Sequence, residues 1–250
     1  MTLNFHSGGQ NICGISIGVL CLDSMFPKPP GHIKNPSGLG FTVLYETIEG
    51  ATVKTLLDGP GESFIEPFID AARRLEAEGV RAITGSCGFL ALYQRQIADA
   101  VNIPVFVSSL IQVPLAYHIG GGRRPIGILT ASSNSLTKVH FEAVGAAGIP
   151  VAIQGMDEYT EFTEVIVEAQ RNCMNIQKVE DEVIDAATVL TRNTPDISAI
   201  VLECTDMPPY ARRIQQQTGL PVYDLTTLAH MVHGVVLRRD YSGFMPREPG

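Results

Sequence analysis

The feature that most constrains the fold of this chain is an internal repeat. Residues 81–110 and 198–227 align without a gap, and eight of the thirty aligned positions are identical. Unrelated segments would share roughly two at ordinary residue frequencies. The repeat places Cys87 over Cys204, with a shift of 204 − 87 = 117 residues. The chain is therefore predicted to consist of two similar halves, each carrying one of these cysteines after an apolar run.

A second pair of matching segments supports the duplication. Gly18–Ser24 (GVLCLDS) and Gly127–Ser133 (GILTASS) stand at the start of the two halves. The glycine run Gly120–Gly122 precedes the second segment and is typical of a boundary loop. We expect the last segment, from Leu225 onward, to cross back to the first half. The predicted domains are 1–118 plus 225–250 for the first and 119–224 for the second.

Strand-length apolar runs alternate with helical patterns along the chain. Strands are expected at Ile15–Leu22, Thr42–Thr47, Ala82–Thr84, Val105–Val107, Ile126–Thr130, Ala199–Leu202 and Val222–Tyr223. Helical spacing of apolar residues covers Phe64–Ala77, Leu90–Ala100, Leu136–Ala147, Glu158–Val167, Lys178–Thr191 and Ala211–Gln217. Because buried parallel strands read as near-continuous apolar runs between helices, the predicted fold class is α/β with parallel sheets.

Charge and cysteine usage exclude several partners. With a net charge of −8 and no long basic cluster, the chain lacks the footprint of a nucleic-acid or anionic-membrane binder. No apolar stretch is long enough to span a bilayer, and Met1–Gln10 lacks the features of a signal peptide. The five cysteines show no metal-type spacing, so we expect reduced thiols, a cytoplasmic protein and no bound metal.

Cys87 lies in the segment Thr84–Phe89 (TGSCGF), between an expected strand and the helical pattern at Leu90–Ala100. A thiol at a helix N-terminus is expected to have a lowered pKa, because aligned amide dipoles favour the thiolate. The flanking glycines let backbone N–H groups approach a ligand closely. A single cysteine in such a turn is more often a small packing residue, and that is the interpretation we give Cys13, Cys21 and Cys173.

Cys204 also ends an apolar strand, in the segment Leu202–Pro209 (LECTDMPP). The two prolines are well placed to begin the next helix, since proline favours the first helical turn. Thr205 and Asp206 offer a hydroxyl and a carboxylate to a ligand, although such residues also cap helices routinely. The matched positions of the two cysteines in a duplicated chain favour a functional pair over two separate packing residues.

Two facing thiols suit proton transfer at carbon. Inversion of a carbon acid needs a base on one face and an acid on the other, and a thiol can serve as either near neutral pH once its pKa is tuned. Since reacting atoms meet at about 3–3.5 Å, the two sulfurs should lie roughly 7 Å apart across the substrate carbon. In open α/β sheets, ligands bind at the carboxyl ends of strands, where both cysteines are expected.

The motif Glu203-Cys204-Thr205-Asp206 is similar to the second cysteine motif of the aspartate/glutamate racemase superfamily. Asp23-Ser24 resembles the pair that holds the substrate's amino end in glutamate racemases. The resemblance covers roughly Gly14 to Val236. The superfamily includes glutamate, aspartate and hydantoin racemases, arylmalonate decarboxylase, maleate isomerase and an algal dimethylsulfoniopropionate lyase.

The resemblance implies two pseudo-symmetric Rossmann-like domains with the active site between them, in a homo-oligomer such as a dimer or tetramer. The first motif departs from the amino-acid racemases, which carry Cys-Asn-Thr where this chain has Cys87-Gly88-Phe89. The loss of two polar groups argues against ordinary aspartate or glutamate as the substrate. The presence of both cysteines argues against the decarboxylase, which keeps only the second.

We therefore predict a cofactor-independent racemase or epimerase of a small carboxylate-bearing compound, such as an amino acid, a hydantoin or a related acid. Cys87 and Cys204 are the predicted acid/bases. The alternatives are a lyase or decarboxylase using mainly Cys204, and a non-catalytic protein that binds a small ligand. The predicted substrate-binding residues are Asp23, Ser24, Ser86, Gly88, Thr130, Ser132, Ser133, Thr205 and Asp206.

Overall fold

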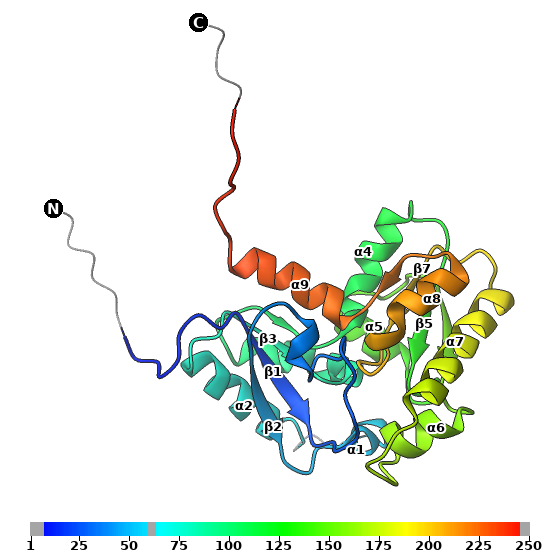
Figure 1. Cartoon of the computed structure of the whole chain (residues 1–250), viewed down its shortest axis with the longest axis horizontal. Coiled ribbons are helices and arrows are strands. Elements are labelled where there is room, and N and C mark those ends of the chain that lie inside the picture. Colours follow the sequence, from blue (N-terminus) through cyan, green and yellow to red (C-terminus); the bar gives the residue numbers. More distant parts are fainter. Residues whose placement is uncertain (1–7, 60–63, 246–250) are drawn as a thin grey trace, which may run out of the picture.

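A computed structural model describes residues 8–59 and 64–245. Each half of the chain forms one four-stranded sheet, whose strands are parallel and which is flanked by helices (Figure 1). The strand orders are β2-β1-β3-β4 and β6-β5-β7-β8, so the two sheets have the same topology. The predicted α/β class with parallel sheets is confirmed.

The first sheet is built around β1 (Ile17–Leu22), whose six residues are all buried. On one side it pairs with β2 (Val43–Ile48), and on the other with β3 (Ala82–Gly85), which in turn pairs with β4 (Val105–Phe106). A strand covered by helices on both faces has no solvated side, which explains the uninterrupted apolar sequence of β1.

The second sheet is built around β5 (Ile126–Thr130), which is also entirely buried. It pairs with β6 (Val151–Gly155) and β7 (Ala199–Leu202), and β7 pairs with the short β8 (Val222–Tyr223). Strand β6 is absent from the strands predicted above. Its sequence VAIQG lies at the sheet edge and is largely half-exposed, so it lacks the continuous apolar run of a central strand.

Helical segments cover both sheets. The α-helices are α1 (Val53–Leu57), α2 (Glu66–Ala77), α3 (Gln94–Asp99), α4 (Gln112–Ile119), α5 (Lys138–Ala143), α6 (Thr160–Phe162), α7 (Ile176–Asn193), α8 (Ala211–Thr218) and α9 (Leu225–Val236). Short 3₁₀ helices are η1 (Pro36–Gly38), η3 (Gly88–Tyr93), η4 (Ser109–Ile111) and η6 (Pro208–Tyr210), and η5 (Thr163–Val167) is a π-helix. The predicted helix at Leu90–Ala100 thus begins as 3₁₀ and becomes α-helical only at Gln94.

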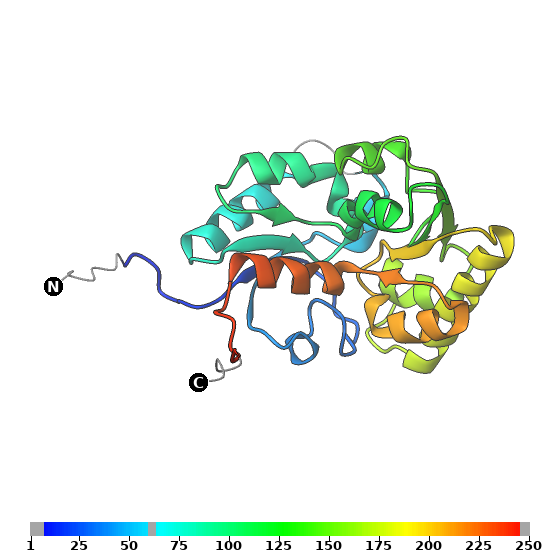
Figure 2. The same cartoon turned by 90° about the horizontal axis from the view of Figure 1, so that it is seen from above.

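The helix after the last strand of each sheet packs on the other half of the molecule. Helix α4 packs against β5 and β7 of the second sheet, and α9 packs against β3 of the first. Figures 1 and 2 show α9 leaving the second half and running across the first. The side chain of Gln112 joins the two exchanged helices by donating a 2.7 Å hydrogen bond to the carbonyl oxygen of Asp224. The domain limits 1–118 plus 225–250 and 119–224 stay a prediction. Helix α4 lies almost entirely in the first predicted domain by sequence but packs on the sheet of the second.

The polar motifs of both halves follow the carboxyl ends of central strands. Asp23 and Ser24 follow β1, Ser86 and Cys87 follow β3, and the Glu203-Cys204 motif follows β7. Residues 23–42, which we call the β1–β2 segment, are long and contain only the helix η1. Phe26, Ile33 and Leu39 in this segment are nevertheless buried, so the segment is packed against the body of the protein.

Candidate active site

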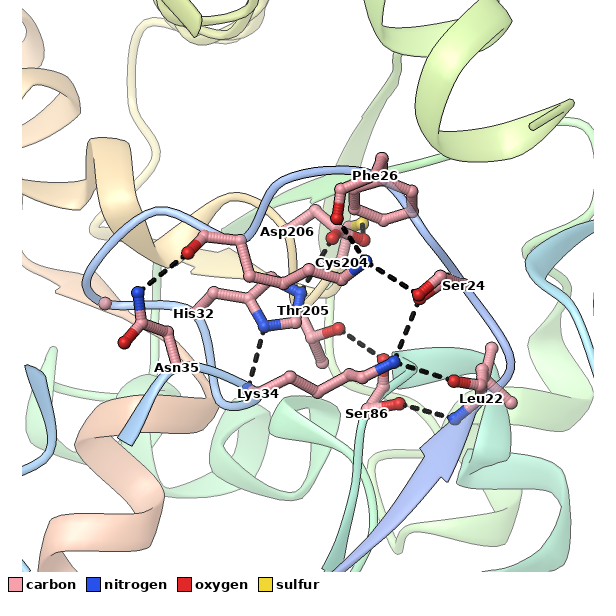
Figure 3. A network of polar contacts seen from close by, with 12 residues as sticks. Leu22, Ser24, Phe26, His32, Lys34, Asn35, Ser86, Cys204, Thr205 and Asp206 are labelled. Carbon is pink, nitrogen blue, oxygen red and sulfur yellow. Dashed lines mark hydrogen bonds and ion pairs between the residues drawn. The ribbon is translucent and has the colours of Figure 1, made fainter. Parts of the chain in front are cut away.

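The two cysteine loops meet through their neighbouring residues. The hydroxyl of Thr205 donates a 2.6 Å hydrogen bond to the carbonyl oxygen of Ser86. The hydroxyl of Ser86 in turn accepts a 2.8 Å hydrogen bond from the backbone N–H of Leu22, at the end of β1. Figure 3 shows these contacts beside Cys204. The loops that follow β1, β3 and β7 are therefore held together at one place between the sheets.

Cys87 caps the N-terminus of η3 and is only 6% exposed. Burial raises the pKa of its thiol well above the ordinary value, and the nearby Glu203 carboxyl adds to the rise. The predicted lowering of this pKa by a helix terminus is therefore wrong. The reason is that only the N–H of Phe89 stabilises the thiolate, and this single contact is outweighed by the loss of solvent.

Cys204 is also 6% exposed, and its pKa is raised by burial and next by the charge of Asp206. Its thiol donates to Oδ2 of Asp206, with 3.5 Å between sulfur and oxygen. Cys87 is the last and smallest of the groups that raise the pKa of Cys204. Pro208 begins η6 two residues after Asp206, and this confirms the predicted role of the prolines.

Asp206 is held from the opposite side by a histidine of the β1–β2 segment. Nε2 of His32 lies 2.8 Å from Oδ1 of Asp206, and the backbone N–H of Lys34 donates to Nδ1 of His32 at 2.8 Å. Both His32 and Asp206 are buried, at 2% and 7% exposure. Figure 3 shows His32 between Lys34 and Asp206. The site thus contains a continuous chain of contacts from the β1–β2 segment to the Cys204 thiol.

Glu203 is a fully buried acid beneath the first cysteine loop. Its Oε2 accepts a 2.8 Å hydrogen bond from the hydroxyl of Thr130, while Oε1 has no hydrogen-bond partner. Burial raises the pKa of Glu203 to about 8, so the carboxyl is mostly protonated at neutral pH. Gly88 lies directly against this residue, and a Cβ at position 88 would overlap both the carbonyl oxygen and Oε1 of Glu203. The glycine is therefore required by packing.

Two lysines of the β1–β2 segment fix Ser24. Nζ of Lys34 donates to the Ser24 hydroxyl at 3.0 Å and to the carbonyl oxygen of Leu22 at 2.8 Å. Nζ of Lys28 donates to the carbonyl oxygen of Ser24 at 2.9 Å and lies 3.6 Å from the centre of the Phe26 ring. Burial and the neighbouring Lys34 lower the pKa of Lys28 to about 8. The Phe26 ring thus already has a cation on its face.

Asp23 and Ser133, two of the remaining predicted binding residues, line cavities whose walls do not include Cys87 or Cys204. Asp23 accepts a 3.3 Å hydrogen bond from the N–H of Gly50, and it lines a cavity of about 260 Å³ that reaches Arg171 in the second half. The hydroxyls of Ser132 and Ser133 donate to Asp157 at 2.6 and 2.7 Å. Ser133 also lines a cavity of about 620 Å³ formed by residues 133–192. A role for these three residues in substrate binding stays a prediction.

Sequence reasoning did not find His32, Lys34 or the buried acid Glu203. His32 and Lys34 lie in a segment without periodicity, where the spacing of residues carries no structural signal. Glu203 was identified only as part of a motif. The packing role predicted for Cys13 and Cys173 is wrong, because both side chains are exposed. The same prediction fits Cys21, which is buried. Its burial raises the pKa of that thiol to about 11.

Residues 115–231 match the family model described as Asp/Glu/Hydantoin racemase. A dimethylsulfoniopropionate lyase of Durusdinium sp. clade D is 31% identical over 221 residues, which cover 86% of this chain and 72% of that protein. Dimethylsulfoniopropionate lyase 5 of Emiliania huxleyi is 28% identical over 228 residues, which cover 87% of this chain. The chain spans only 45% of the length of that second relative.

Solved structures show the same architecture. Unliganded arylmalonate decarboxylase superimposes with a TM-score of 0.57 at 14% identity, covering 89% of this chain and 92% of that one. An aspartate racemase homologue from Pyrococcus horikoshii OT3 gives 0.56 at 17% identity, covering 88% and 98%. The fold and the site thus define a two-lobed α/β protein with one buried cysteine from each half. The chain belongs to the aspartate/glutamate/hydantoin racemase superfamily, a family of enzymes.

In residues 8–59 and 64–245, no helix combines the length and the apolar character needed to cross a membrane.

Proposed function

We propose that this protein is a lyase that eliminates a β-substituent from a small carboxylate, with dimethylsulfoniopropionate as the first substrate to test. The observation that carries the proposal is the 31% identity to the Durusdinium lyase over 86% of the chain. The likeness to the aspartate racemase homologue comes with only 17% identity and concerns the fold alone. The sequence by itself favours a racemase with a lyase as rival, and the long similarity to lyases reverses that order.

The reaction requires one base. The thiolate of Cys204 takes the proton from the carbon next to the carboxylate, and the electron pair of that C–H bond forms the carbon–carbon double bond. The bond from the β-carbon to sulfur breaks, its electron pair stays on sulfur, and a neutral sulfide leaves. The products are an unsaturated acid and the sulfide, and the thiol later gives its proton to solvent. Hydrogen-bond donors near the substrate carboxylate stabilise the charge that develops in the transition state.

The electrostatics of the site support a cationic substrate. The pKa values of both thiols are raised by burial and by nearby carboxyl groups, so Cys204 is protonated in this conformation. A sulfonium group placed beside the thiols adds positive charge and lowers their pKa values, because an opposite charge favours the thiolate. Binding of a sulfonium substrate therefore favours the Cys204 thiolate, which is the base of the proposed reaction.

A racemase is the second candidate, and one observation favours it. The two cysteines occupy matched positions in the duplicated halves and are both buried at the junction of the loops. Elimination of a neutral sulfide needs no second acid, whereas inversion at carbon needs an acid on the opposite face. In both cases we propose that Ser24, Ser86, Gly88, Thr130, Thr205 and Asp206 shape the binding site.

We also propose that the protein acts in the cytoplasm as a homo-oligomer and uses neither a metal nor an organic cofactor. Activity should survive exhaustive chelation and treatment with hydroxylamine, which traps pyridoxal phosphate. It should be lost on thiol alkylation, and substrate should protect against that loss. Inactivation by a chelator that is reversed by added metal would contradict this part of the proposal.

Proton NMR in deuterated water, with a panel of carboxylates, sulfonio-acids and hydantoins, tests the function. A new alkene with release of sulfide identifies a lyase, and loss of carbon dioxide identifies a decarboxylase. Deuterium at the α-carbon of an intact skeleton identifies a racemase. Saturable binding without any of these changes identifies a ligand-binding protein. Efficient racemisation of free aspartate or glutamate would show that the first motif, Cys87-Gly88-Phe89, does not exclude amino acids.

A further inference from the structure

We propose that His32 is a positioning residue for Cys204, because it holds the Asp206 carboxylate with one oxygen turned to the thiol. The inference rests on the proposed function in one respect, that Cys204 moves a proton. It assigns a role to the β1–β2 segment, which belongs to the first half of the chain, in setting the acid/base group of the second half.

The first observation is the chain of contacts. The two oxygens of Asp206 face different partners: Oδ1 lies 2.8 Å from Nε2 of His32, and Oδ2 accepts from the Cys204 thiol at 3.5 Å. The three side chains are exposed by 2%, 7% and 6%, so solvent cannot substitute for any of these contacts. Without the contact to His32, the Asp206 carboxylate would be held at Oδ2 only and could rotate about its Cβ–Cγ bond.

The second observation fixes the proton on the imidazole. The backbone N–H of Lys34 points at Nδ1 of His32 at 2.8 Å, so Nδ1 is the acceptor. In the neutral ring the proton is then on Nε2, where it is donated to Asp206. The short segment from His32 to Lys34 thus supplies both the donor for Asp206 and the contact that selects the tautomer.

The third observation is that the segment is anchored where it carries the histidine. Gly31 has a φ of +103°, and a Cβ there would come within 3.0 Å of Cα of Pro209, in the helix that follows the Cys204 motif. The carbonyl oxygen of Gly31 accepts a 2.7 Å hydrogen bond from the hydroxyl of Thr226 on α9. These contacts place the imidazole against the second half independently of its bond to Asp206.

The consequence concerns the proton shared by Cys204 and Asp206. Two anions 3.5 Å apart in a buried site disfavour each other, so the pair is expected to hold one proton between sulfur and Oδ2. The N–H of His32 stabilises the charge on Asp206 and so favours the shared proton on the sulfur of Cys204. The other charged or titratable groups that bear on this pair are Glu203, Cys87, Lys28 and Tyr210.

A matched pair of variants tests the role. His32→Gln and His32→Met introduce side chains of nearly equal length, but only glutamine has an N–H for Asp206. We expect His32→Met to lower kcat about a hundredfold with KM within about twofold, since a misplacement of about 1 Å can have that effect. The kcat of His32→Gln should be at least about tenfold higher than that of His32→Met. Replacement of the exposed His118 by methionine is the control and should leave the rates unchanged.

A second readout does not need turnover. The pH dependence of alkylation, followed at each cysteine by mass spectrometry, reports the two thiols separately in the intact protein. In His32→Met the midpoint for Cys204 should move down by about one unit, because Asp206 without its donor holds the shared proton more firmly and no longer repels the thiolate. The Cys87 midpoint should not move. Equal profiles in folded Gln and Met variants overturn the inference, whereas inactivity of the parent with every substrate overturns only the proposed function.

Discussion

The hydroxyl of Thr205 donates a 2.6 Å hydrogen bond to the carbonyl oxygen of Ser86, and so joins the residues next to the two cysteines. Both groups are buried, with Thr205 1% exposed. A loop that follows a strand has many accessible conformations, and this contact removes some of them at the point where the two halves meet. The relative position of Cys87 and Cys204 therefore depends on a side chain that need not touch the substrate.

Thr205→Val should separate the two loops without changing the size of the side chain. The carbonyl oxygen of Ser86 loses this donor in a buried site, which should lower the free energy of unfolding by about 1–3 kcal/mol. The rate should fall by roughly a hundredfold if the sulfurs shift by about 1 Å. Urea denaturation and steady-state kinetics measure the two effects. Thr205→Ser keeps the hydroxyl and is the control; if it is as impaired as the valine variant, the hydrogen bond to Ser86 is not what holds the two loops.

Gly88→Ala should destabilise the protein more than an ordinary substitution at a helix N-terminus. The added Cβ overlaps the backbone carbonyl oxygen of Glu203, which cannot turn aside as the end of a side chain can, and also Oε1 of the same fully buried residue. Overpacking of this kind lowers the free energy of unfolding by about 1–3 kcal/mol or more. Gly234→Ala is the matched control, because a Cβ at that helical position meets no atom within 4 Å. Equal melting temperatures of the two variants would contradict the packing role.

Glu203 should make the stability of the protein fall as the pH rises. Its pKa is raised by burial from 4.5 to about 8, so between these values the folded state keeps a proton that the unfolded state has released. Stability is then largest below about pH 4.5 and is lost up to about pH 8, which is the sign expected when the native state binds more protons. The effect is on the order of a few kcal/mol.

Glu203→Gln imitates the protonated acid and should remove this contribution. The test is the difference in the free energy of unfolding between the parent and the variant, measured from pH 5 to pH 8.5. Subtraction of the two curves removes other groups that titrate in the range, such as His140, whose pKa is lowered by burial. A difference that does not change with pH would mean that Glu203 is ionised in the folded protein.

The strands show how much of the fold the sequence carries. The predicted bounds of Ile126–Thr130, Ala199–Leu202 and Val222–Tyr223 are those observed for β5, β7 and β8. The central strands β5 and β7 are covered on both faces, so their limits coincide with the limits of the apolar run. Strand β8 is a two-residue edge strand, whose match follows from the repeat with β4. Edge strand β6 and helix α4 do not follow such a pattern. The sequence of α4, QVPLAYHI, contains a proline and an apolar stretch without helical spacing, since Val113 and Ala116 pack against the second sheet whereas Leu115 and Ile119 are exposed.

The sequence likewise predicts one part of the candidate site and not the other. The internal repeat places the two cysteines at equivalent strand ends, and with them the contact between Ser86 and Thr205 becomes foreseeable. The role of His32 cannot be predicted from the repeat, because it depends on how the β1–β2 segment packs against Pro209 and α9. The thiol pKa values also depend on burial, which a motif does not reveal. For this reason the sequence predicts a lowered pKa at Cys87, whereas the structure gives a raised one.

The two cysteines should contribute unequally if the protein is a lyase. Cys204→Ser should lower elimination by about 10²–10⁴-fold, the contribution of a general base, because an alcohol is a far weaker acid than a thiol and does not supply the anion. Cys87→Ser should retain most of the activity, since a sulfide leaves without being protonated. The exposed Cys173, replaced by serine, is the control for loss of a thiol as such. The measurement is the rate of alkene formation for each variant, together with deuterium exchange at the α-carbon. Equal loss of all turnover in Cys87→Ser and Cys204→Ser, with exchange of a single enantiomer surviving in each, would instead support the two-base racemase.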